Sequence, residues 1–327
     1  MQETMTVSTI GYRSLLQSEL AEVESLMLAV PSAAPAAVRA AVSALIRGGG
    51  KRLRPALVLL LAHIHRADAS AALPTAAAIE MLHTATLIHD DLIDNADVRR
   101  GVETLNATWS PAATVLVGDL MFAHAAELAT RSENIHLVRR FAQTLSTICR
   151  GELDQLLNGR GSLPTEAAYY ERIYSKTASL FGLATEAGPI LAGEPAEGCD
   201  RARRFGVLLG QAFQIADDVL DFIGSESMLG KPLGSDLRQG LITLPVLHFA
   251  ETHPDDPRVS AVLSHTAGSA IIASLVHDLR ASDAAEWTMA RAAAHVEEAL
   301  NLLVAYPASV YRDALYEIAA FATQRLL

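Results

Sequence analysis

The sequence contains little cysteine and no long apolar run. Two cysteines, Cys149 and Cys199, stand alone without a CxxC spacing, which excludes a disulfide framework and a zinc ribbon and favours a reducing compartment. The densest apolar run, Ala56 to Ala62, lies between Arg54 and His63 and is far shorter than the roughly 18 residues that span a bilayer. The first residues show no basic-then-apolar signal sequence. We therefore expect a cytoplasmic protein without a transmembrane segment.

Positive charge is also scarce. The 26 basic and 37 acidic residues give a net charge of -11, which argues against nucleic acid as a partner. Charged residues make up only 19% of the chain and hydrophobic residues 50%. This composition excludes intrinsic disorder, because such a chain can bury enough apolar surface to offset its conformational entropy. A length of 327 residues supports one large domain or two ordinary ones without disulfides or metals.

Alternating β-branched runs of strand length are few, and apolar residues instead recur at every third and fourth position. Val296, Leu300, Leu303 and Val304 are one example. This spacing predicts an all-α fold. Glycine- and proline-rich breaks separate the helical segments, but none is long or polar enough to be a domain linker. We expect a single domain over residues 1–327.

Two of the predicted helices are apolar on nearly every side and carry carboxylates at one end. They cover Thr75 to Asn95 and Arg204 to Phe222, and such sequences are typical of central, buried helices. Each ends in the motif DDxxD, formed by Asp90, Asp91 and Asp94 in the first and by Asp217, Asp218 and Asp221 in the second. The first and last aspartates of each motif are one helical turn apart and share a face.

Three carboxylates on adjoining turns repel one another and resist burial unless a cation lies among them. Their hard oxygen ligands suit Mg²⁺, which prefers a few carboxylates, several waters and substrate phosphates to an all-protein cage. A solvated acidic helix end explains a single motif equally well. Two copies at the ends of apolar helices favour a magnesium site that binds a phosphate-bearing ligand.

Basic residues close to these motifs agree with an anionic ligand. The segment GGGKRLRP at 48–55 opens an apolar helix, so its backbone N–H groups, Lys51 and Arg54 could meet a phosphate. It is not a P-loop, since no Ser or Thr follows Lys51, and on its own it is explained by a helix end followed by a basic helix start. Arg99 and Arg100 follow the first acidic motif and supply the further cations that a magnesium-bound diphosphate needs.

Taken together, these segments resemble the trans-isoprenyl diphosphate synthases of the polyprenyl synthetase family, especially its long-chain members. The matching segments occur in the family's order over most of the chain: GGGKRLRP at 48–55, EMLHTATLIHDDLIDNADVRRG at 80–101, GDLMFAHA at 118–125, GELDQ at 151–155, KTASLF at 176–181, GQAFQIADDVLDF at 210–222 and LGKPLGSDL at 229–237. The resemblance implies an isoprenoid synthase fold, a bundle of about ten or more helices around a central cavity.

The resemblance also implies a role for each matching residue. Asp90, Asp94 and Asp217 would ligate magnesium directly, and Asp91, Asp218 and Asp221 would act as outer or water-mediated partners. Isopentenyl diphosphate would be held by Lys51, Arg54, His83 and Arg100, and the allylic diphosphate by Arg99, Lys176 and Lys231. Thr177 and Gln214 would face the reacting carbons, so that the catalytic group comprises Lys176, Thr177, Gln214 and Lys231. Outside this context, Lys176 would be taken for a surface lysine and His83 for a core histidine.

The implied reaction condenses isopentenyl diphosphate with farnesyl or geranylgeranyl diphosphate. Three Mg²⁺ ions and the basic residues stabilise the departing pyrophosphate, the allylic C–O bond ionises, and the double bond of isopentenyl diphosphate attacks the carbocation. A proton is then lost, and the resemblance implies that pyrophosphate takes it. The segment Ser225 to Thr243 is expected to close over the diphosphates, and aliphatic helix walls exclude water.

Product length is expected to depend on the residues that precede the first acidic motif. Ala85 and Thr86, about one turn before Asp90, are small where family members with short products carry bulky aromatics, and a turn of about 5.4 Å spans roughly one isoprene unit. We expect a heptaprenyl to decaprenyl product (C35 to C50), as quinone side chains need. A geranylgeranyl or farnesyl diphosphate synthase is the alternative, because Met81 and Leu82 could floor the tunnel near twenty carbons. Small residues here could also serve only close helix packing.

Two other classes are less consistent with the sequence. A class I terpene cyclase usually carries Asn, Ser or Thr, and Glu in its second metal motif, and a non-catalytic partner subunit tends to lose its aspartates, whereas all six are present here. Leu241 and His124 depart from the family pattern, where a lysine and an arginine are common. The resemblance further implies a homodimer, with release of the product close to a membrane.

Overall fold

The computed structural model describes residues 11–29, 34–48, 50–99, 102–158, 162–224 and 233–324. These residues form helices joined by short turns: α1 (Tyr12–Leu15), α2 (Gln17–Leu28), α3 (Ala36–Arg47), α4 (Leu53–His65), α5 (Ala69–Ile93), α6 (Leu105–Thr108), α7 (Pro111–Thr130), α8 (Ile135–Asn158), α9 (Glu166–Ile173), the π-helix η1 (Tyr174–Ala178), α10 (Ser179–Leu191), α11 (Ala196–Ile223), α13 (Ser235–Arg238), α14 (Leu244–Thr252), α15 (Pro257–Leu263), α16 (Ser269–Ala281), α17 (Ala284–Leu303) and α18 (Val310–Gln324). One antiparallel hairpin, β1 (Val98–Arg99) and β2 (Val102–Glu103), follows α5. The all-α prediction is confirmed.

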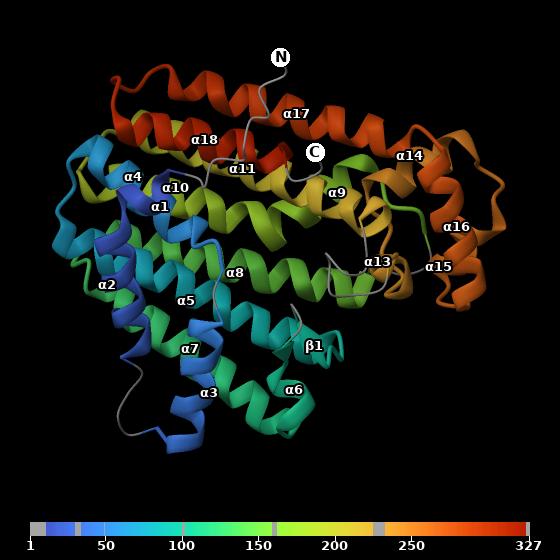
Figure 1. Cartoon of the computed structure of the whole chain (residues 1–327), viewed down its shortest axis with the longest axis horizontal. Coiled ribbons are helices and arrows are strands. Elements are labelled where there is room, and N and C mark those ends of the chain that lie inside the picture. The colour runs from blue at the N-terminus through green and yellow to red at the C-terminus, as the bar shows by residue number, and fades with distance from the viewer. Residues whose placement is uncertain are drawn as a thin grey trace, which may run out of the picture.

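The long helices lie in layers that run along one axis of the molecule (Figure 1). Helix α5 packs against α7 and α4, α10 packs against α4 and α11, and α17 covers α11. The sequence explains the central position of α5, since an apolar surface on all sides can be satisfied only by neighbours on all sides. Its start is fixed by Asp68, whose side chain accepts a hydrogen bond from the backbone N–H of Ser70 at 2.8 Å.

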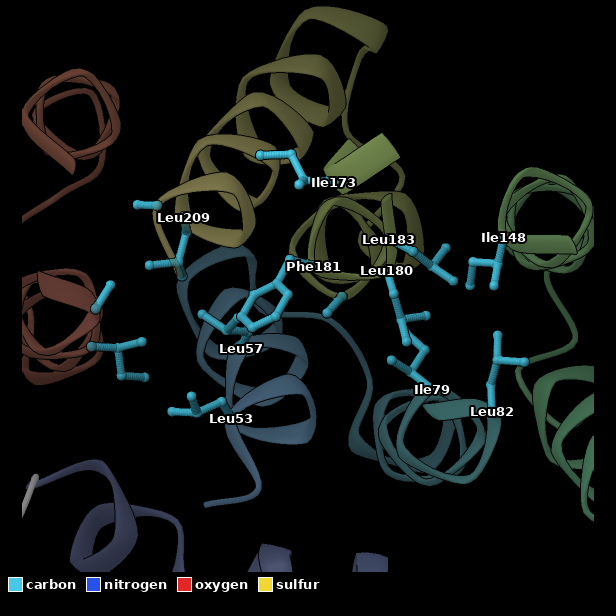
Figure 2. Close-up of a cluster of buried hydrophobic side chains, with 14 of the residues drawn as sticks. Leu53, Leu57, Ile79, Leu82, Ile148, Ile173, Leu180, Phe181, Leu183 and Leu209 are labelled. Carbon is cyan, nitrogen blue, oxygen red and sulfur yellow. The ribbon is translucent and has the colours of Figure 1, made fainter. Parts of the chain in front are cut away.

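The interior between these helices is mainly aliphatic. Figure 2 shows Phe181 of α10 lying near Leu57 of α4, while Leu82 of α5, Ile148 of α8 and Leu183 of α10 point toward one another. All five side chains are at most 5% exposed. Branched aliphatic side chains therefore form most of the wall beside α5, as the low aromatic content suggests.

Two of the described helices, α5 and α7, are long and apolar enough to cross a membrane by length and composition alone, which differs from the expectation drawn from uninterrupted apolar runs. The physical reason lies in their packing. The apolar window of α5 is 72% buried inside the bundle and that of α7 is 44% buried, and the two helices pack against each other. Core helices have the same composition as membrane spans, so this is weak evidence for a membrane segment.

The C-terminal ends of α5 and α11 point toward the end of the bundle that carries β1 and α13 (Figure 1). The two acidic motifs occupy these helix ends. The fold therefore brings two motifs about 130 residues apart in sequence to the same end of one bundle.

Candidate active site

The first acidic motif lies at the C-terminal end of α5, and its three aspartates range from buried to exposed. Asp91 is only 6% exposed and accepts a hydrogen bond from Nε of Arg99, on β1, at 2.6 Å. Asp90 is half-buried, and Asp94, which caps the helix, is exposed. The hairpin thus returns Arg99 onto the motif that precedes it. Arg99, expected to hold the allylic diphosphate, engages a carboxylate in this structure.

Lys176 lies close to the first motif although it comes from a different part of the chain. Its Nζ is 3.0 Å from Oε1 of Glu152, on α8. Burial alone would lower the pKa of Lys176, but the nearby carboxylates of Asp90, Glu152 and Asp94 raise it above its usual value. Lys176 is therefore firmly protonated and carries a positive charge beside the first motif.

Burial dominates the electrostatics of these aspartates. It raises the pKa of Asp90 to about 6, against the lowering effect of Lys176, while Glu152 and Asp94 raise it further. Burial also raises the pKa of Asp91 and Asp94, although Arg99 opposes the shift at Asp91. Carboxylates that resist ionisation in the protein alone gain most from a cation placed among them.

The segment that carries Lys176 and Thr177 is not an ordinary α-helix. Residues Tyr174–Ala178 form a π-helical turn, a feature common at functional sites. Two glycines let this turn lie tightly between α8 and α11. A Cβ atom at Gly151 would be 2.4 Å from Cβ of Ser175, and one at Gly210 would be 2.6 Å from Cα of Ala178. Any side chain at either position would push η1 away from its neighbours.

The second acidic motif lies on the other side of η1 and is more buried than the first. Asp218 and Asp221 are 3% and 1% exposed, and Asp217 is half-buried. Asp218 accepts two hydrogen bonds, at 2.8 Å from Nε2 of Gln214 and at 2.7 Å from the hydroxyl of Tyr169. Burial raises the pKa of Asp218 to about 6, although both hydrogen bonds oppose this shift.

Two chains of contacts connect the motifs. In the first, Lys176 faces the Asp90 side of the site, while the next residue, Thr177, donates to Oε1 of Gln214 at 2.7 Å, and Gln214 donates in turn to Asp218. The sequence-predicted residues Asp90, Asp94, Lys176, Thr177, Gln214 and Asp218 therefore form one continuous region.

The second connection runs through α13. Oδ1 of Asp221 accepts from the hydroxyl of Ser235 at 3.1 Å, and Oδ2 accepts from the backbone N–H of Asp236 at 3.1 Å. At the other end of this short helix, the Gln239 side chain hydrogen-bonds Asp94 and partly offsets the rise that burial causes in the pKa of this carboxyl. One segment therefore contacts the last aspartate of both motifs.

The basic segment at the start of α4 is held by aromatic rings and by Arg52. Nζ of Lys51 lies 4.0 Å from the ring centre of Phe321, on α18, and the guanidinium of Arg54 lies 4.5 Å from that of Phe181. Arg52 has a left-handed backbone (φ 50°) and is only 9% exposed. Its guanidinium pairs with Glu80 at 3.2 Å and with Glu24 at 3.0 Å, which anchors the segment to α5 and α2.

Some predicted residues stand apart from these contacts or outside the described parts of the chain. His83 is half-buried on α5, two turns before Asp90. Arg100, Lys231 and the first eight residues of the predicted closing segment, 225–232, lie outside the described residues. His124, which departs from the expected family pattern, is 3% exposed and bonds the carbonyl of Leu26 on α2 at 3.3 Å, a contact between helices rather than within the site.

The carboxylate oxygens of the two acidic motifs are the candidate ligands for magnesium. Among the described residues, no group of three or more His, Cys, Asp or Glu side chains converges on one point. Mg²⁺ keeps several waters and needs only one or two carboxylates together with substrate phosphates. Asp90, Asp94 and Asp217 supply such oxygens without forming a closed cage, so the residues fit a cation that arrives with its diphosphate.

Comparison with known proteins agrees with this geometry. The polyprenyl synthetase family model matches residues 35–279. The chain belongs to the polyprenyl synthetase family. It is 35% identical to "Heptaprenyl diphosphate synthase component 2" of Geobacillus stearothermophilus, over 95% of this chain and 97% of that one, and 36% identical to "Octaprenyl diphosphate synthase" of Escherichia coli, over 86% and 88%. A crystal structure of a polyprenyl synthase from Caulobacter crescentus, complexed with calcium and isoprenyl diphosphate, superposes with a TM-score of 0.91 at 34% identity over 99% of both chains.

As a member of the polyprenyl synthetase family, the chain is a transferase of the polyprenyl diphosphate synthase class, with the all-α isoprenoid synthase fold. Sequence reasoning missed several residues around the family's motifs. Glu152 lies in the matching segment GELDQ but had no assigned role. Arg52 lies between Lys51 and Arg54, two residues predicted to bind a diphosphate, and also had none. Tyr169 and Gln239 left no signal, because their contacts with Asp218 and Asp94 depend on the fold.

Proposed function

We propose that the protein is a magnesium-dependent prenyltransferase that condenses isopentenyl diphosphate with farnesyl or geranylgeranyl diphosphate to an all-trans polyprenyl diphosphate. The observation that carries the proposal is the continuous region in which Lys176 faces the first DDxxD motif and Thr177 connects to the second. In this proposal the domain covers residues 1–327, since α17, beyond the matched range, packs on α11.

The chain's own residues then divide the work. Bound Mg²⁺ would offset the charge of the departing diphosphate at Asp90, Asp94 and Asp217. Lys176, whose pKa is raised, supplies a fixed positive charge beside the first motif. Thr177 and Gln214, which are hydrogen-bonded to each other at 2.7 Å, would face the reacting carbons. The basic residues Lys51, Arg54, His83 and Arg100 would hold isopentenyl diphosphate; Arg99 and Lys231 would join Lys176 at the allylic diphosphate.

We propose a long product, heptaprenyl to decaprenyl, as quinone side chains require. Ala85 lies on α5 just over one turn before Asp90, and its small buried side chain would obstruct a chain growing along this helix less than an aromatic ring would. Further down the helix, Leu82 points toward Ile148 and Leu183 (Figure 2), a flexible aliphatic wall rather than an aromatic floor. A geranylgeranyl or farnesyl diphosphate synthase is the alternative.

The activity is tested with purified protein, Mg²⁺, isopentenyl diphosphate and, in separate reactions, geranyl, farnesyl and geranylgeranyl diphosphate. We expect condensation with farnesyl or geranylgeranyl diphosphate and products of C35 to C50, and no product after chelation of the metal. Products that stop at C20 would establish the shorter-chain alternative. Absence of condensation with every primer would refute the enzyme proposal.

Product length is tested by Ala85→Phe, which places an aromatic ring in the proposed path. We expect products of about C15, since each helical turn corresponds to roughly one isoprene unit. Ala292→Phe is the matched control, because Ala292 is equally buried but lies on α17. If folded Ala85→Phe protein gives products of unchanged length, the growing chain does not run along α5 past Ala85.

We also propose that the enzyme is a cytoplasmic homodimer formed through α7 and α8, with release of its product near a membrane. These helices pack together yet leave Leu116 and Leu157 67% and 75% exposed. The relative from Geobacillus stearothermophilus is named as a component, so a second kind of subunit is the alternative. Light scattering should show a dimer for the wild type and for Val304→Glu, at another exposed apolar position, but a monomer for Leu116→Glu combined with Leu157→Glu.

A further inference from the structure

Tyr169 belongs to none of the sequence motifs, yet it contacts the centre of the candidate site. It lies on α9, is 0% exposed, and donates its hydroxyl proton to Oδ2 of Asp218 at 2.7 Å. Its ring is held independently, with its edge toward Tyr170 at 5.5 Å and with the guanidinium of Arg172 at 5.4 Å from its centre. The ring explains the packing of Tyr169, but it does not explain why a buried hydroxyl points at a catalytic motif.

The hydroxyl of Tyr169 is one end of a chain of three hydrogen bonds. Oδ1 of Asp218 accepts from Nε2 of Gln214 at 2.8 Å, and Oε1 of Gln214 accepts from the hydroxyl of Thr177 at 2.7 Å. Each distance is that of a well-formed hydrogen bond, and the chain crosses from α9 through α11 to η1. It therefore couples a residue outside the motifs to the residue expected at the reacting carbons.

The chemistry of these groups allows only one order of donors and acceptors along this chain of hydrogen bonds. A carboxylate only accepts, so Asp218 accepts hydrogen bonds from the hydroxyl of Tyr169 and from the amide nitrogen of Gln214. The amide then has to present its oxygen to Thr177, and the hydroxyl of Thr177 has to donate to it. With its proton committed to Gln214, Thr177 offers only oxygen lone pairs to whatever lies on its other side.

We propose that Tyr169 is a positioning residue that fixes the direction of this chain, so that Thr177 presents lone pairs to the positive charge that develops on the allylic substrate. The inference rests on the proposed prenyl transfer. Preorganised dipoles stabilise a carbocation most when they need no rearrangement during the reaction. Removing the hydroxyl leaves one oxygen of a buried carboxylate without its donor, and Gln214 loses the fixed partner that orients its amide.

Tyr169→Phe is the direct test, because it removes the hydroxyl and keeps the ring. A lost hydrogen bond to a charged group predicts a fall in kcat of about 10- to 100-fold. The KM values of both substrates should stay within about twofold, since the Tyr169 hydroxyl bonds Asp218 rather than a residue proposed to hold a diphosphate. Tyr170→Phe is the matched control, since Tyr170 is the neighbouring half-buried tyrosine and lies outside the chain; it should retain wild-type kcat.

A double-mutant cycle separates positioning from general support of the fold. If Tyr169 acts through Thr177, Tyr169→Phe should cost little in a Thr177→Val background, because the chain is already broken there. In a Thr177→Ser background, which keeps a donor hydroxyl, the loss should return. Additive losses in the Val background would overturn the inference. Should Tyr169→Phe fail to fold, Gln214→Glu serves instead, because its carboxylate cannot donate to Asp218 and should likewise lower kcat more than KM. An unchanged kcat in Gln214→Glu would also overturn it.

The outcomes for the two proposals remain distinct. A wild-type protein that condenses no primer refutes the proposed function. An active wild type with an additive cycle refutes only the role of Tyr169.

Discussion

The two DDxxD motifs have the same sequence pattern but differ in how far their carboxylates are exposed. The first lies at an open helix end, where Asp94 is exposed and its charged neighbours, Lys176 and Arg99, come from other elements. The second is largely enclosed, with Asp218 and Asp221 3% and 1% exposed and both oxygens of each carboxylate hydrogen-bonded.

This difference indicates that the first motif is arranged for ligand binding and that most of the second motif makes hydrogen bonds within the fold. In the first motif, the exposed Asp94 and the basic side chains of Lys176 and Arg99 fit the proposed binding of a metal-bound diphosphate. In the second, Asp218 hydrogen-bonds Gln214 and Asp221 hydrogen-bonds the start of α13, while Asp217, the proposed metal ligand, is half-buried. A sequence repeat therefore predicts shared chemistry only at its first position.

The largest effects are expected at these first positions. Asp90→Asn and Asp217→Asn should each lower kcat by about 10²- to 10³-fold, because each removes charge that a metal ion needs to stabilise the leaving diphosphate. Steady-state kinetics at saturating Mg²⁺ measure this loss. Melting temperatures should not fall, since each change keeps the size of the side chain and removes only its negative charge. A loss fully restored by high Mg²⁺ would show weakened binding rather than lost transition-state stabilisation.

The last positions should separate the motifs by stability instead. Asp221→Ala is expected to lower the free energy of unfolding by about 1–3 kcal/mol, because it leaves the backbone N–H of Asp236 and the hydroxyl of Ser235 without their acceptor. Asp94→Ala, at the matching but exposed position, should change it by less than about 0.5 kcal/mol. Urea denaturation of the two variants measures both. Equal losses would mean that the two motif ends are equivalent after all.

Most of the architecture, and part of this contrast, could be predicted from the sequence. The 3.6-residue periodicity predicted the all-α fold, and the all-round apolar character of α5 predicted its burial. Both follow from local spacing. The enclosure of Asp218 could not be predicted, because its partner Tyr169 lies 49 positions earlier and has no motif.

The close approach of η1 to its neighbours was also invisible in the sequence. The glycines that allow it, Gly151 and Gly210, stand in matching segments, but only the packing of α8 and α11 shows what a side chain there would meet. A search for unbroken apolar runs overlooks α5, whose apolar composition serves burial in the bundle.

The smallest effect concerns the stability of the protein without metal. Burial raises the pKa of Asp90 from 3.8 to about 6, so the folded state binds more protons than the unfolded state between these values. The stabilisation from this proton is present at low pH and is lost as pH rises through about 6. Asp90→Asn mimics the protonated form. Its melting temperature should therefore be about 1–3 °C above that of the wild type at pH 8, and equal to that of the wild type at pH 4.

Calorimetry at the two pH values measures this difference, and Asp255→Asn, at an exposed position in the turn after α14, is the control that should match the wild type at both. Adding Mg²⁺ with inorganic pyrophosphate at pH 8 should reverse the order of the melting temperatures, because the ligand stabilises only the protein whose Asp90 carboxylate can ligate the ion. If Asp90→Asn melts below the wild type in the absence of metal, the carboxylate contributes to the fold as Asp221 does, and the contrast between an open first motif and an enclosed second motif does not hold.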